Sequence, residues 1–147
     1  MHLRLRILGL LTATGLLLAC VPATAVEWFT VTGDKSKPEV DTTQIDASTI
    51  DRRNNALGLR FRVTLAQARK GARGDTYQSY LSHIAVECAS GAIFHEDQRR
   101  FLEPLWTGAS TFERFPQARP MAFVGLLPDP RPLILDIACG KKNAARQ

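Results

Sequence analysis

The chain has 147 residues, of which 45% are hydrophobic, 22% are charged and 7% are aromatic, and its formal net charge is +5. A chain of this length is expected to fold as one globular domain with a hydrophobic core of its own. Beyond the first 25 residues no apolar run is long enough to cross a bilayer, which excludes a second membrane segment.

The segment 1–25 has the order of a secretory signal peptide. A short basic start precedes an apolar run over 7–18, and Pro22 and three small residues follow. The run is too short to span a bilayer but has the length of a signal-peptide core. We therefore expect export, with cleavage after Ala25. Removing 25 of the 147 residues leaves 122, and since two of the 19 basic residues go with them, the net charge falls from +5 to +3.

Three cysteines are an odd number, which needs an explanation in an exported protein. Signal-peptide cleavage would discard Cys20. Alternatively, Leu-Leu-Ala-Cys at 17–20 is a lipobox, residues 1–19 are a lipoprotein signal, and Cys20 carries a lipid. Both routes leave Cys88 and Cys139, and we expect these two to form a disulfide in an oxidising compartment. The competing interpretation is a pair of buried free thiols.

Strand-compatible segments open the mature chain. Aromatic and β-branched residues over 27–31 favour a strand, a turn over 33–38 follows, and 40–50 favours extended structure again. Residues 51–55 favour a turn, because the two asparagines there tolerate positive φ. We expect a hairpin around that turn.

The clearest pattern is a strict alternation over 57–65. Apolar side chains occupy every odd position of this segment, and the even positions hold glycine, arginine or threonine. A period of two is typical of a strand with one buried face and one solvated face. Arg60 and Arg62 therefore share the solvated face, and a basic loop over 66–75 follows the predicted strand.

The second half of the chain has weaker patterns. Residues 76–88 favour a strand, 92–94 favour its partner, and 121–127 favour a further strand. Residues 95–101 have no settled period, and 103–120 have only a weak one.

A short helix is predicted near the C-terminus. Prolines at 130 and 132 suit its first turn, and Gly140 suits its end. A disulfide from Cys139 to Cys88 would fasten this helix to a strand, which matters because so short a helix is marginal alone. The residues expected to face the core are Leu133, Ile134, Ile137 and Ala138.

Motifs for catalysis or cofactors are absent from the sequence. It has no zinc-type cysteine cluster, phosphate-binding glycine loop, nucleophile elbow or His-Glu-x-x-His motif, so we expect no cofactor and no metal. Ser82 is disfavoured as a nucleophile for His83, because neighbouring strand residues point to opposite faces. The alternative function is a periplasmic enzyme or inhibitor that uses His83, His95 and Glu96.

Cationic residues gather around the alternating strand. They predict a surface for an anionic partner, either an extracellular protein or an anionic glycan. Nucleic acid is excluded, because no stacking-aromatic motif accompanies the arginines. A membrane would be reached only through a lipid on Cys20. The competing interpretation is that the charges merely solvate the strand and prevent edge pairing. The candidate binding residues are Arg60, Arg62, Arg69, Lys70 and Arg73.

Several of these features, taken in order, resemble one known family. The residues concerned are Trp28, the stretch 46–50 (Asp-Ala-Ser-Thr-Ile), Tyr80, Ser82, the pair Glu87 and Cys88, and Cys139. Their order resembles the bacterial surface-adhesin protein E family of small exported proteins. The resemblance implies an α+β fold: a small twisted antiparallel sheet over 26–147, with a C-terminal helix held on it by the cysteine pair. It also implies a non-catalytic, adhesin-like binding role towards host matrix or serum proteins. The remaining alternative is a purely structural envelope protein.

Overall fold

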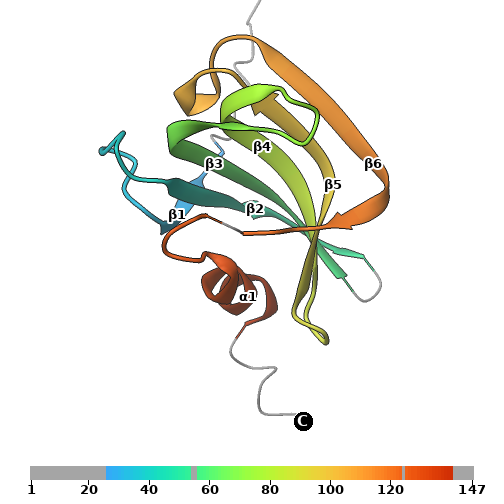
Figure 1. Cartoon of the computed structure of the whole chain (residues 1–147). Helices are drawn as coiled ribbons and strands as arrows, with labels where there is room; N and C mark the ends of the chain where they lie inside the picture. The colour runs from blue at the N-terminus through green and yellow to red at the C-terminus, as the bar shows by residue number, and fades with distance from the viewer. Residues whose placement is uncertain (1–25, 54–55, 124, 141–147) are drawn as a thin grey trace, which may run out of the picture.

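Six strands form one antiparallel sheet in the order β1-β2-β3-β4-β5-β6, so each strand pairs with its neighbour in sequence (Figure 1). The computed structural model describes residues 26–53, 56–123 and 125–140. The strands are β1 (Trp28–Thr32), β2 (Thr42–Arg53), β3 (Ala56–Lys70), β4 (Thr76–Glu87), β5 (Ala92–Phe101) and β6 (Ser110–Pro120). A short 3-10 turn, η1 (Pro104–Trp106), precedes β6, and a helix, α1 (Arg131–Cys139), ends the described chain. The expected α+β fold, an antiparallel sheet with a C-terminal helix, is confirmed.

The alternation in β3 divides the sheet into two faces. The odd positions from 57 to 65 are all buried, while Arg60 and Arg62 project from the opposite side. Residues paired across antiparallel strands share a face, so the register extends this division to every strand. We call the side of Phe61 the helix face, because α1 packs there, and the other side the arginine face. The arginine face carries Trp28, Asp46, Arg60, His83, Asp97 and Arg114 in one row and Thr30, Gln44, Arg62, Leu81, Arg99 and Phe112 in the next.

The helix face buries one continuous hydrophobic core. Phe61 lies at its centre, with ring centroids 6.1 Å from Tyr80 and 6.4 Å from Phe123. The chain leaves β6 and crosses this face to reach α1, which adds Ile134 and Ala138 (Figure 1).

The strand expected over 121–127 is wrong. This segment is the crossing between β6 and α1, and its described residues belong to no strand. Met121 and Phe123 are buried and Ala122 is exposed, so burial alternates as in a strand although the segment packs over the sheet. Met121 N–H donates to the carbonyl of Ile93, at 2.9 Å.

Of the four helix residues expected to face the core, two are buried. Ile134 and Ala138, one turn apart, are buried as expected. Leu133 and Ile137 are exposed, so their placement in the core was wrong. Each lies one residue, about 100° of helical rotation, away from the buried pair. Because α1 packs on the sheet through so narrow a stripe, only a small part of its surface is buried.

Strands extend further than the sequence pattern predicted. β3 continues to Lys70, into the expected basic loop, and β6 lies where only a weak pattern was seen. The reason is a set of register shifts, between Thr64 and Arg69 in β3 and between Arg114 and Arg119 in β6. Each shift breaks the period of two that identifies a strand in the sequence.

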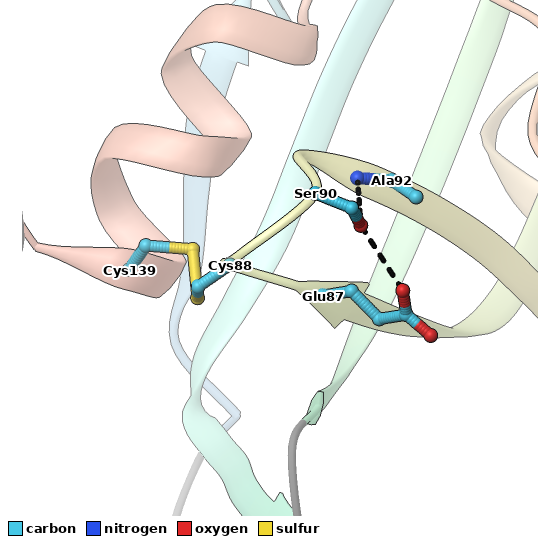
Figure 2. Close-up of a disulfide and its surroundings, with 5 residues drawn as sticks. All are labelled: Glu87, Cys88, Ser90, Ala92 and Cys139. Atoms are coloured by element: carbon cyan, nitrogen blue, oxygen red, sulfur yellow. Dashed lines mark hydrogen bonds between the residues drawn. A yellow bond between two sulfur atoms is a disulfide. The ribbon is translucent and has the colours of Figure 1, made fainter. Parts of the chain in front are cut away.

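The predicted disulfide between Cys88 and Cys139 is confirmed (Figure 2). It joins Cys88, the residue after β4, to the last residue of α1, and the two Cα atoms lie 5.6 Å apart. Next to it, Ser90 Oγ donates to a carboxylate oxygen of Glu87 at 3.0 Å and accepts from Ala92 N–H at 3.2 Å, which fixes the β4–β5 turn. The predicted signal peptide and Cys20 lie outside the described residues. Of the helices that the structure describes, none has the length and apolar character to cross a membrane.

We predict that losing the disulfide destabilises the fold strongly. The crosslink spans 51 residues, so removing it restores conformational entropy to the unfolded chain worth about 4 kcal/mol. The comparison is between Cys88→Ser/Cys139→Ser and its parent, both carrying Cys20→Ser, by urea denaturation. A difference below about 1 kcal/mol would show that α1 is held by packing alone.

Candidate functional site

A stacked cation is the central feature of the arginine face. The guanidinium carbon of Arg62 lies 3.9 Å from the ring centroid of Trp28 and 3.8 Å from that of Trp106. Arg62 Nε also donates to Gln44 Oε1 at 2.9 Å. We call Trp28, Arg62 and Trp106 the tryptophan clamp. Burial, followed by the charge of Arg60, lowers the pKa of Arg62 to about 10, so the group is still a cation at neutral pH.

The clamp holds the η1 turn in a strained conformation. Leu105 and Trp106 have φ angles of 55° and 61°, a left-handed region that costs a non-glycine residue roughly 1–3 kcal/mol. Ser79 on β4 fixes the turn, because its Oγ accepts from Trp106 N–H at 2.9 Å and donates to the carbonyl of Glu103 at 2.7 Å. The indole Nε1–H of Trp106 donates to the carbonyl of Tyr80 at 3.2 Å.

This strained turn displays apolar side chains to solvent. Leu105 is 58% exposed at its tip, Leu102 before it is also exposed, and Phe112 is 54% exposed on the neighbouring strand β6. Strain at a rigidly held surface loop is typical of binding and catalytic sites. The arrangement is therefore a candidate contact surface.

A groove of about 170 Å³ runs beside these residues on the arginine face. Arg60 and Arg99 lie along it, together with His83 and Asp97. His83 Nδ1 is 2.9 Å from both carboxylate oxygens of Asp97, so these two groups engage each other. The guanidinium of Arg99 lies 5.5 Å from the ring centroid of Phe112, and among the described residues it has no carboxylate partner.

The predicted basic residues divide into three environments. Arg60 and Arg62 lie together on the arginine face. Arg69 pairs with Asp41 at 2.7 Å, and Arg73 pairs with Glu113 at 2.6 Å, so a carboxylate offsets each of these charges. Lys70 lines a cavity on the helix face. The structure thus gathers two of the five candidate residues into one surface.

Arg99, Phe112 and the tryptophan clamp were not identified from the sequence. Trp28, Arg62 and Trp106 are far apart in the chain, and only β1–β2–β3 pairing and the η1 turn bring them together. Arg99 lies in a segment without a settled period. Placing Arg99 on the arginine face from the sequence would have required knowledge of the bulge that interrupts β5.

The two histidines do not form a common site. His83 belongs to the arginine face, whereas His95 belongs to the helix face, opposite Ile84 and Arg119 in the register. A pocket that combines both histidines with an acid, as the enzyme hypothesis requires, is not formed by the described residues.

Ser82 Oγ on β4 contacts the imidazole of His95 on the neighbouring strand β5, whereas its contact with His83 is to the backbone carbonyl, at 3.2 Å. Its Oγ lies 2.6 Å from His95 Nδ1, and it also contacts the carbonyl of Asp97. The hydroxyl has one hydrogen, which it donates to that carbonyl, so we assign Nδ1–H of His95 as the donor to Ser82 Oγ. In this arrangement His95 cannot accept the Ser82 proton, which removes the activation that a nucleophile needs.

Burial also suppresses the charge on His95. Desolvation, followed by the nearby Arg119 and Arg100, lowers the pKa of its imidazole to about 4. His95 is therefore neutral at pH 7. Within the described ranges no cluster of three or more histidine, cysteine, aspartate or glutamate side chains could hold a metal ion.

We predict that Arg62→Lys weakens the clamp. Lysine keeps the charge but loses the planar group that stacks between the two indoles and the Nε contact to Gln44. The free energy of unfolding should fall by about 1–2 kcal/mol, and the amide of Trp106 should exchange faster with deuterium. Arg99→Lys, at an exposed position on the same face, is the matched control. Equal stability of the two variants would contradict the role given to the clamp.

We predict a loss of stability at acid pH that depends on His95. The unfolded chain binds a proton near pH 6.5, whereas the folded chain binds it only near pH 4. Stability is therefore complete above about pH 6.5 and declines by about 3 kcal/mol as the pH falls to about 4. Urea denaturation across this range should show the decline in wild type and in His83→Gln, and a smaller one in His95→Gln. If the decline in His95→Gln were as large as in wild type, the role given to His95 would be contradicted.

Comparison with known proteins gives a limited result. No family model matches the chain, and no curated protein matches it. The chain is similar to solved structures of Haemophilus influenzae protein E. One has a TM-score of 0.48 and 16% identity, over 85% of this chain and 84% of that one. A second crystal form has a TM-score of 0.45 and 16% identity, over 66% of this chain and 79% of that one.

Proposed function

We propose that this chain is an exported, non-catalytic, adhesin-like binding protein whose arginine face binds an acidic protein outside the cell. The observation that carries the proposal is the η1 turn. It holds Leu105 in solvent through a strained backbone, next to Trp106, which stacks on the fixed Arg62. The same face of the sheet also carries the exposed Arg99 and Arg114.

The composition of this face supports protein binding. Tryptophan and arginine are the residues that most often dominate the energetics of protein interfaces, and exposed leucine and phenylalanine side chains add apolar area. Arg62 is already immobilised by the clamp, so binding costs little of its conformational entropy. A surface whose charges only solvate the strand needs neither exposed apolar side chains nor an immobilised arginine.

The charges of the face favour an acidic partner. Arg99 and Arg114 are exposed, and among the described residues neither forms an ion pair with a carboxylate. Arg60 lies 3.7 Å from the buried Asp46, so that charge is partly offset. A sulfated glycan would use the same arginines, but it would gain little from Leu105 and Phe112. The apolar residues therefore favour a protein over a glycan.

Three observations support export and a surface location. The segment 1–25 has the pattern of a signal peptide, and the disulfide is of a kind that persists in oxidising compartments. The resemblance of the sequence to the surface-adhesin protein E family points the same way. A lipid on Cys20 would anchor the protein, whereas cleavage after Ala25 would release it.

Surface plasmon resonance on the purified chain tests the proposal, with solubilised basement-membrane matrix, serum proteins and heparin as immobilised probes. We expect binding to matrix or serum protein that weakens at least about thirtyfold in Leu105→Asp and in Arg99→Glu. Arg52→Glu, an exposed position at the far end of β2, carries the same charge change and should bind as wild type does.

Three other outcomes would contradict the proposal. Binding to heparin alone, insensitive to Leu105→Asp, would identify a glycan as the partner. Equal binding by Arg99→Glu and Arg52→Glu would remove the arginine face from the interaction. Binding to none of the probes would favour the purely structural alternative.

A further inference from the structure

A second cavity, of about 220 Å³, opens on the helix face, away from the arginine face. It lies where the β3–β4 hairpin, the middle of β4 and β5, and the end of β6 meet. Its side chains include Lys70, Tyr77, Tyr80, His95, Phe115 and Arg119. No step of the proposed function uses this cavity.

Two polar groups in this cavity lack partners in the protein. Tyr80 is only 7% exposed, yet its hydroxyl forms no hydrogen bond with any described residue. His95 uses Nδ1 for Ser82, while its Nε2 has no partner among the described residues. The two rings are neighbours, with centroids 6.4 Å apart. Neither atom is sealed inside the core, so both are available to a ligand or water that enters the cavity.

The walls are aromatic and the opening is cationic. The ring of Tyr77 lies 6.1 Å from that of Tyr80, and the ring of Phe115 lies 6.2 Å from that of His95. The guanidinium carbon of Arg119 is 5.6 Å from the centroid of Phe115. Within the described residues, neither Arg119 nor Lys70 forms an ion pair with a carboxylate.

A neighbouring cavity differs because its cationic side chains are paired with carboxylates. It has about 180 Å³ and is lined by Arg73, Asp75, Arg100 and Glu113. Arg100 lies 3.1 Å from Asp75 and 3.6 Å from Glu113, and Arg73 lies 2.6 Å from Glu113. These charges offset one another, so that cavity leaves no charged group for a ligand.

We propose that the cavity of Tyr80 and His95 binds a small aromatic or flat apolar acid. Its carboxylate lies at Arg119 and Lys70, and a hydroxyl or amine at its other end donates to His95 Nε2. Because Nδ1–H of His95 is engaged with Ser82, Nε2 offers a lone pair and accepts this bond. Tyr80 supplies a second polar contact. The volume is below the roughly 300–1,000 Å³ of pockets for drug-sized ligands, which fits an acid with one ring.

The test is a two-dimensional NMR titration of the full chain with 4-hydroxybenzoate, which carries both the carboxylate and the donor. We expect saturable shifts at Tyr80, His95 and Phe115. Benzoate lacks the donor and should bind roughly two- to tenfold more weakly. The uncharged 4-hydroxybenzamide lacks the carboxylate and should bind more weakly still, since charge-assisted hydrogen bonds are about twice as strong as neutral ones.

Variants locate the interaction. Arg119→Glu should abolish the saturable shifts, and Tyr80→Phe should weaken binding roughly two- to tenfold. Arg52→Glu has the same charge change at the opposite end of the sheet and should bind as wild type does. Absence of saturable shifts in the wild-type chain, or equal binding by Arg119→Glu and Arg52→Glu, would overturn the proposal. The cavity and the arginine face are on opposite sides of the sheet, so failure here is distinguishable from failure of the proposed function.

Discussion

The two-sided burial of β3 is the constraint on which the rest of the structure depends. Its odd positions are inserted into the core and its even positions carry the arginines, so a slip of one residue would exchange the two sets. Burial of each large apolar side chain contributes about 1.5–3 kcal/mol, and five of them fix the register together. Because β3 pairs with β2 and β4, this register decides which side chains of those strands meet on each face.

A bulge in β5 then separates the polar chemistry of the two faces. In a regular strand His95 and Asp97 would project from the same side, because they are two residues apart. The register shift leaves Glu96 as the extra residue, and it sends His95 to the helix face and Asp97 to the arginine face. His95 thereby lies half-buried beside Ser82 and Tyr80, while Asp97 engages the exposed His83. One irregularity thus contributes both to an aromatic-walled cavity on the helix face and to a charged groove on the arginine face.

Local patterns predicted the parts of the fold that depend on local physics. The alternation identified β3, the prolines and Gly140 bounded α1, and the cysteine count identified the disulfide. Bulges concealed β6 and the length of β5, because an extra residue inverts the alternation beyond it. Segment 121–127 imitated a strand since it crosses the core with alternate residues buried.

The candidate sites were less predictable than the fold, because their members meet only after folding. Arg62 was expected as a solvated cation, but the two indoles that enclose it come from β1 and the η1 turn. Arg69 and Arg73 were expected on a cationic surface, yet Asp41 and Glu113 from other strands or loops offset their charges. The contact between Ser82 and His95 depends on the β5 bulge, which no local pattern announced.

A lysine scan of β3 tests the central claim most directly, with the free energy of unfolding measured at positions 59 to 63. Lysine at Leu59, Phe61 or Val63 places an unpaired charge in the core, which should cost about 3–5 kcal/mol or prevent folding. At Arg60 lysine keeps a positive charge beside the buried Asp46, so the cost should stay near 1 kcal/mol. The predicted result is a large loss of stability at Leu59, Phe61 and Val63 and a small loss at Arg60. Similar losses at Arg60 and Phe61 would contradict the division of the sheet into a helix face and an arginine face.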